Sequence, residues 1–265
     1  MSTIRIVPFH DADPDNPVAW ERFTYFMARY EKDYPKSDWP TFVYDSVTSG
    51  SLAARKRHEK VLNPMVKFAK GTDTRQWYAG ETDDCEEMYI MRFGSLEMNV
   101  VLICHIDERR NEMSGEILRG PSASGRLSKR GMLSMAYQEQ YHAFAYREEG
   151  KRVYALQTAN DGTWVATSQL NAPEVCYPHY NSLFEHAPER YGKPIHVLIY
   201  GDSGVGKSTF ASTFREVGNV VVINFDPHGK DMPYSKGAKS VGEWQTYDIG
   251  GAHGSVPIVY RDVVF

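Results

Sequence analysis

The sequence predicts a three-layer α/β fold with a central, mostly parallel sheet, and two observations carry that prediction. Short apolar runs that end in polar residues recur along the chain, and segments with the 3.6-residue period of helices lie between them. A glycine-rich turn also joins one apolar run, at 197–200, directly to a helical segment. Alternation of strands with helices is typical of parallel sheets that are covered on both faces.

The most specific pattern is HVLIYGDSGVGKST at 196–209. It satisfies G-x-x-x-x-G-K-[ST] between a strand and a helix that we expect over about 207–216. Glycines allow a tight turn whose N–H groups point into one concavity, where they hold phosphate oxygens. Lys207 supplies a cation to the β- and γ-phosphates, and Ser208 supplies a hydroxyl ligand to Mg²⁺. The residues expected to bind the phosphates are Gly201, Asp202, Ser203, Gly204, Val205, Gly206, Lys207, Ser208 and Thr209.

The position of this motif in the chain is unusual. Several βα units normally follow it, but the stretch 209–265 contains one clear strand, at 220–225, a glycine-rich loop and a β-like run at 257–265. The expected strand that ends in a Mg²⁺-linked aspartate lies upstream instead, in TFVYDS at 41–46. This Walker B pattern makes Asp45 the predicted second metal ligand, beside Ser208.

Two more elements surround that strand. The stretch Pro17–Tyr34 has apolar residues near helical spacing, with Asp15 or Asn16 as its predicted cap. A third strand is expected at 99–106, with His105 near its end.

These pieces fall into order when the chain is read as a circle from Ser182. The strand-like runs 258–265 and 3–7 would then form a hairpin. We therefore predict one circularly permuted domain over 1–265, because permutation is tolerated where the original termini are close. Its parts are 1–170, a linker over the original termini at about 171–183, and the motif-bearing part 184–265. The alternative is two fragments that do not complete each other, and a natural or an engineered origin is equally compatible.

In this order the chain resembles the RecA-like branch of P-loop ATPases, and more narrowly the phage AAA-type nucleotide-binding ATPases related to phage single-strand-annealing ATPases. The stretches that carry the resemblance are HVLIYGDSGVGKSTFASTF (196–214), NVVVINFDPHG (219–229), TFVYDSVTSG (41–50) and NVVLICHIDERR (99–110). The resemblance implies a RecA-like core that binds ATP with Mg²⁺ and hydrolyses ATP to ADP and phosphate.

The resemblance also implies catalytic roles, for Lys207, Asp226 and His105. Asp226 matches the carboxylate that polarises the attacking water, although such ATPases carry the longer Glu there; a turn aspartate before Pro227 is the alternative. His105 matches a polar sensor near the γ-phosphate, and a satisfied strand-end histidine is the alternative. Candidates for a Lys or Arg that reaches a neighbouring subunit's nucleotide are Lys129–Arg130 and Lys151–Arg152, with solvated turns as the alternative.

Positive charge is concentrated in two stretches of a chain whose net charge is -4. The stretch 109–130 contains GPSASG, which predicts a flexible loop. In RecA-like recombinases a loop at this place binds single-stranded DNA, so the resemblance implies DNA contacts. The residues concerned are Arg109, Arg110, Arg119, Arg126, Lys129 and Arg130, against Glu112 and Glu116. The second basic run, 55–70, lies on a predicted helix, and a solvated face is its alternative.

The motifs predict a Mg²⁺-dependent ATPase. The resemblance further implies that it binds single-stranded DNA in phage recombination or annealing, as a homo-oligomeric ring or filament. One alternative is a nucleotide-binding assembly or switch protein without motor activity, and another is a permuted scaffold with weak ATPase activity. The three cysteines are widely spaced, and the sequence has neither a long apolar run nor a recognisable leader. We therefore expect no membrane contact and a cytoplasmic location, in the host if a phage encodes the chain.

Overall fold

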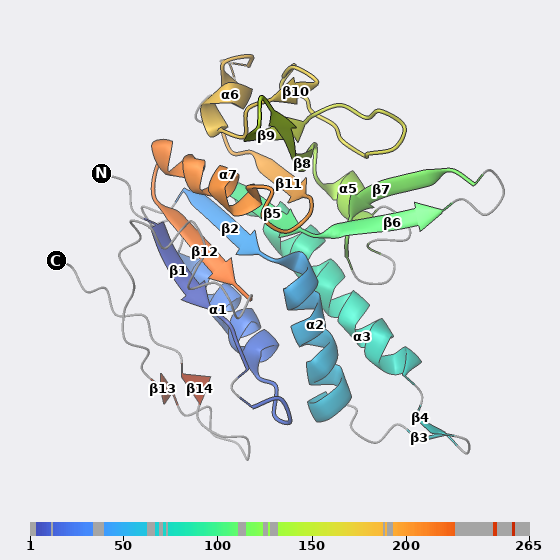
Figure 1. Cartoon of the computed structure of the whole chain (residues 1–265). Helices are drawn as coiled ribbons and strands as arrows, with labels where there is room; N and C mark the ends of the chain where they lie inside the picture. Colours follow the sequence, from blue (N-terminus) through green and yellow to red (C-terminus); the bar gives the residue numbers. More distant parts are fainter. Residues whose placement is uncertain are drawn as a thin grey trace.

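A computed structural model describes residues 4–11, 13–33, 40–62, 67–68, 71–72, 74–110, 115–123, 127, 132–187, 189, 193–225, 246–247 and 256–257. Its centre is an 8-stranded sheet (Figure 1). In order across the sheet the strands are β1 (Ile4–Pro8), β12 (Val220–Asn224), β2 (Thr41–Asp45), β5 (Asn99–Cys104), β11 (His196–Tyr200), β8 (Glu139–Glu148), β9 (Lys151–Gln157) and β10 (Val175–Cys176).

The sheet is parallel from β1 to β8, and only β9 and β10 run antiparallel to their neighbours. Every residue of β2, β5 and β12 is buried, which is the pattern of strands covered on both faces. The predicted α/β class with a mostly parallel central sheet is thus confirmed.

Helices cover both faces of the sheet and make three layers (Figure 1). One face carries α1 (Ala19–Asp33), α2 (Val47–Arg57) with the π-helical η2 (His58–Leu62), α3 (Arg75–Glu86) with the π-helical η3 (Glu87–Arg92), and α5 (Met132–Ala136). The other face carries α6 (Tyr180–Phe184), α7 (Lys207–Thr213) and the 3₁₀ turn η5 (Phe214–Glu216). Within the part of the chain described, no helix is long and apolar enough to cross a bilayer.

Strand register brings the carboxyl ends of the central strands to one edge of the sheet. Asp45 on β2 is level with Asn224 on β12 and with Ile103 on β5. Ile103 is in turn level with Ile199 on β11, so the turn after β11 begins level with the end of β2, with only β5 between them. Ligands of open parallel sheets bind at this edge, and the register therefore determines where a site can form.

Short two-stranded elements complete the described structure. They are β3 (Lys67–Phe68) with β4 (Gly71–Thr72), β6 (Ile106–Arg110) with β7 (Ile117–Pro121), and β13 (Thr246–Tyr247) with β14 (Val256–Pro257). The β6–β7 pair corrects the prediction of a flexible loop after His105, because residues 106–110 and 117–121 form a regular antiparallel ladder.

The start of α1 is not capped as predicted. Helix α1 begins at Ala19, and neither Asp15 nor Asn16 caps it; the Asp11 carboxylate accepts hydrogen bonds from the backbone N–H groups of Val18 and Ala19, both at 2.7 Å. The run 258–265, expected to pair with 3–7, lies outside the described residues.

Candidate functional site

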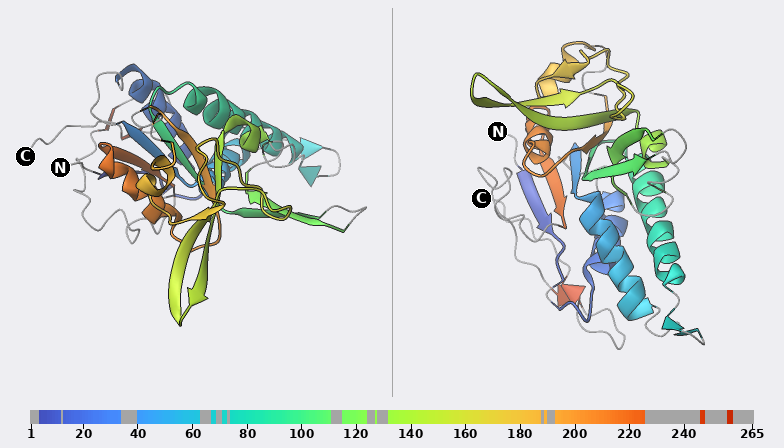
Figure 2. Two further views of the ribbon diagram at one scale, coloured as in Figure 1. Left: turned by 90° about the horizontal axis from the view of Figure 1, so that it is seen from above. Right: turned by 45° about the vertical axis from the view of Figure 1, so that its right-hand side comes forward.

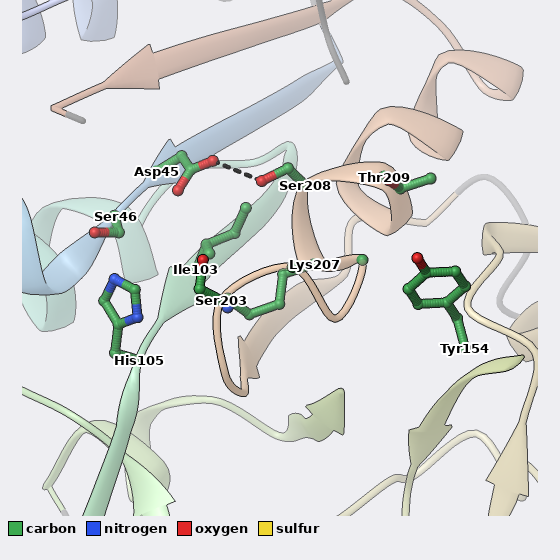
Figure 3. A pocket seen from close by; sticks show the side chains of 11 residues that line it. Asp45, Ser46, Ile103, His105, Tyr154, Ser203, Lys207, Ser208 and Thr209 are labelled. Carbon is green, nitrogen blue, oxygen red and sulfur yellow. Dashed lines mark hydrogen bonds between the residues drawn. The ribbon is translucent and has the colours of Figure 1, made fainter. Parts of the chain in front are cut away.

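A pocket of about 280 Å³ opens where the turn after β11 meets the ends of β2 and β5 (Figure 3). Its lining comes from segments far apart in the sequence: Asp45, Ser46, Ile103, His105, Tyr154, Ser203, Gly204, Gly206, Lys207, Ser208 and Thr209. Most of the residues predicted to bind phosphate therefore face one pocket together with the strand-end residues Asp45 and His105.

Glycines in the turn meet local demands that other residues would not. A Cβ at Gly201 would collide with the backbone carbonyl oxygen of Ala143 on the neighbouring strand β8. Gly204 and Gly206 have φ of 74° and 92°, in the left-handed region that side chains rarely adopt. Gly206 directly precedes α7, so its conformation turns the chain from the loop into the helix.

The Lys207 side chain folds back into the loop that precedes it. Its ammonium group donates to the backbone carbonyl oxygens of Gly201, at 2.9 Å, and Asp202, at 2.7 Å. Burial lowers the pKa of Lys207 below its usual value, and the nearby Asp45 carboxylate opposes that shift. The site thus holds a cation that a buried anion would stabilise further.

Asp45 and Ser208 meet although they are distant in the sequence. The Ser208 hydroxyl donates to Oδ2 of Asp45 at 2.9 Å, and Asp45 is only 3% exposed (Figure 3). Carboxylate and hydroxyl oxygens are hard ligands that suit Mg²⁺, which usually binds through one or two protein groups, water and phosphate oxygens. The donor set fits that ion, and no cluster of three or more His, Cys, Asp or Glu side chains among the described residues offers a different metal site.

His105 immediately follows β5, and its side chain is exposed at the pocket. Its backbone is fixed on both sides, since its N–H lies 3.5 Å from the Thr48 hydroxyl and its carbonyl accepts from Ser122 at 2.7 Å. In Figure 3 the imidazole lies near Ser46, on the side of the pocket that holds Asp45.

The predicted DNA-contacting arginines do not line this pocket. Arg109 and Arg119 lie on β6 and β7 and pair with carboxylates of the same hairpin, Asp107 at 3.2 Å and Glu108 at 2.9 Å. Arg110 is exposed at the end of β6. Asp226, Arg126, Lys129 and Arg130 lie outside the described residues.

Three lining residues were not identified as functional from the sequence: Ser46, Ile103 and Tyr154. Ser46 directly follows β2 and Ile103 lies near the end of β5, and both of these strands were predicted from the sequence. Tyr154 lies on β9, in the β8–β9 hairpin. Arg152, two residues earlier on the same strand, donates to the carbonyl oxygen of Gly204 at 3.1 Å. Arg152 was a candidate for reaching another subunit, and here it contacts the loop of its own chain.

Comparison with known proteins agrees with this geometry over part of the chain. A family model described as an AAA domain matches residues 193–247. The match covers β11, the glycine-rich turn, α7 and β12, and it supports an AAA-type, P-loop ATPase-like domain that binds nucleotide. No curated protein and no solved structure gives a significant match.

Proposed function

We propose that this chain is a Mg²⁺-dependent P-loop ATPase of RecA-like type. The observation that carries the proposal is the hydrogen bond between Ser208 and Asp45, which joins the phosphate loop to the end of β2 in one pocket. A hydroxyl from the loop and a strand-end aspartate are the two protein groups that P-loop enzymes use around their metal ion.

In this proposal the loop N–H groups at 201–208 bind the phosphates, and the Lys207 ammonium exchanges its two carbonyl partners for β- and γ-phosphate oxygens. Asp45 and Ser208 would hold Mg²⁺, which neutralises phosphate charge when bound. His105, which lines the same pocket as Asp45, is proposed to donate a hydrogen bond to the terminal phosphate. Asp226 is proposed as the group that orients the attacking water. Chemistry of this kind depends mainly on positioning and charge.

Circular permutation is part of the proposal, and the sheet order supports it. β1 is the parallel neighbour of β12, and from there β2 and β5 approach β11 in consecutive positions. A chain that ran from β11 to β12 and then on to β1, β2, β5 and β8 would join neighbouring strands at two of these steps, from β12 to β1 and from β2 to β5, and the first of the two exists only in the permuted order. We therefore propose a single RecA-like unit whose original termini lay near 171–183.

Binding of single-stranded DNA by the β6–β7 hairpin and the basic residues that follow it is the finer part of the proposal. Arg110 is exposed there, and the hairpin starts one residue after His105, so DNA and phosphate contacts would share one segment. Service in phage recombination or annealing and action as a ring or filament follow from the resemblance and are proposed with it. A cytoplasmic location is proposed on the cysteine pattern.

Phosphate release from MgATP, measured with and without single-stranded DNA, tests the proposal. We expect Lys207→Ala to lower turnover by roughly 100-fold or more, because a charge that stabilises the transferring phosphate is lost. Lys32→Ala, which removes an exposed lysine from the last turn of α1, is the control and should leave turnover unchanged.

We also expect DNA to raise wild-type turnover and to bind less tightly as salt increases. Equal turnover in wild type and Lys207→Ala would contradict the assignment of the site. Turnover that DNA does not change would favour the nucleotide-dependent assembly or switch protein.

A further inference from the structure

One wall of the pocket comes from a segment outside the phosphate motif. Tyr154 and Arg152 lie on β9, which pairs with β8 to form an antiparallel hairpin that projects from the body of the molecule (Figure 2). The register pairs Ala145 with Tyr154 and Arg147 with Arg152, so Tyr154 and Arg152 share one face of the hairpin. That face is the one that meets the glycine-rich loop.

Both side chains contact the loop or lie against it. The Arg152 guanidinium donates to the Gly204 carbonyl oxygen at 3.1 Å, and its central carbon lies 5.3 Å from the centroid of the Tyr154 ring. A Cβ built on Gly206 would lie 3.4 Å from the Tyr154 ring, so no more than about a methyl group would fit between the ring and this glycine. Arg152 therefore holds the ring and the loop together.

The pocket has two chemically different ends. Asp45, Ser46 and His105 lie at one end, while Tyr154 and Thr209 lie at the other, across the loop (Figure 3). The first end offers a carboxylate, a hydroxyl and an imidazole, and the second offers an aromatic ring that remains 36% exposed. A ligand whose phosphates occupy the loop and whose metal-bound end points to Asp45 would direct its other end to the ring.

We propose that Tyr154 is a nucleobase subsite, on which the base of the nucleoside triphosphate stacks; this inference rests on the proposed function. Aromatic rings stack on any base because every base has a π-face, so the subsite takes purine and pyrimidine nucleotides alike. Arg152 positions the ring by stacking on it, and a planar guanidinium suits that role.

Arg152 has a second effect, on the loop itself. In a trans peptide the C=O and N–H groups point in opposite directions. By holding the Gly204 carbonyl, Arg152 directs the following N–H, that of Val205, away from the hairpin. Its loss should therefore weaken the binding of phosphates as well as that of the base.

Calorimetric titration with ATP and, separately, with inorganic tripolyphosphate tests the subsite. Tyr154→Ala removes one base-stacking ring. We expect this variant to bind ATP about 5- to 150-fold more weakly than wild type and to bind tripolyphosphate with unchanged affinity. Tyr154→Phe keeps the ring and should bind ATP within about twofold of wild type. Tyr146→Ala is the matched control, because Tyr146 pairs with Val153 on the opposite face of the same hairpin.

The outcomes separate the subsite from the function on which it rests. Equal ATP affinity in wild type and Tyr154→Ala would overturn the subsite alone. An equal loss of ATP and tripolyphosphate binding would also overturn it, since the ring would then act only by supporting Gly206. Binding of neither compound by the wild type would overturn the proposed function itself. Arg152→Ala is expected to weaken the binding of both ATP and tripolyphosphate, whereas Tyr154→Ala should weaken the binding of ATP alone.

Discussion

Lys207 places a buried positive charge in the candidate site. Its ammonium group is largely buried and contacts two carbonyl oxygens of its own loop. Carbonyl dipoles stabilise a buried cation less than a phosphate would, which is why burial lowers the pKa of Lys207 from 10.5 in the structure as it stands. A phosphate in the loop should raise that pKa again.

Nucleotide binding should therefore be linked to proton uptake by Lys207. At a pH below the lowered pKa of Lys207 in the free protein, the lysine is already charged, so its titration should not change the ATP affinity. As pH rises through that value towards the raised pKa of the complex, affinity should fall, by up to about tenfold per pH unit. Calorimetry in buffers of different ionisation enthalpy measures the uptake, and Lys207→Arg, which stays charged, should remove it. A wild-type affinity that is constant up to pH 10.5 would argue against the linkage.

The residues of the glycine-rich turn that line the pocket could be singled out from the sequence because a short motif encodes their local backbone geometry. Asp45 was predictable for a similar reason, as a polar residue at the end of an apolar strand. Tyr154 was not, because its place beside Gly206 depends on the pairing of β9 with β8 and on the position of that hairpin beside β11. Such long-range register leaves no signal in the sequence around Tyr154.

At the scale of elements, the central strands were predicted well because they are apolar throughout and end in polar residues. The cap of α1 was not, because Asp11 reaches the helix from seven or eight residues away. The β6–β7 hairpin was missed because Gly, Ser and Pro in GPSASG (120–125) suggested a loop. In the structure β7 is held by another segment: Arg119 donates its N–H to the Thr163 carbonyl at 2.7 Å, and its guanidinium lies over Trp164. Tertiary contacts, not local sequence, therefore determine the strand conformation of β7.

At the scale of the whole molecule, the proposed circular permutation predicts that the chain tolerates reconnection. A gene that begins at Ser182, joins 265 to 2 through a short turn and ends near Tyr180 should encode a protein that folds cooperatively. Its ATP affinity should lie within roughly threefold of the original, since the strand neighbours are unchanged. Thermal unfolding and calorimetry check this, with a control opened between Val101 and Leu102, inside buried β5, that should not fold. Loss of folding in the first variant would contradict the permutation.

The central claim is that two distant segments of the chain form one metal–nucleotide site, and the most direct test concerns Asp45. ATP binding should be titrated in Mg²⁺ and in EDTA, for wild type and for Asp45→Asn. We predict that Mg²⁺ strengthens ATP binding to the wild type and that Asp45→Asn lowers the affinity of the complex for Mg²⁺ about 10- to 100-fold. The same dependence on Mg²⁺ in both proteins would contradict the claim, because the contact between Asp45 and Ser208 would then be structural only.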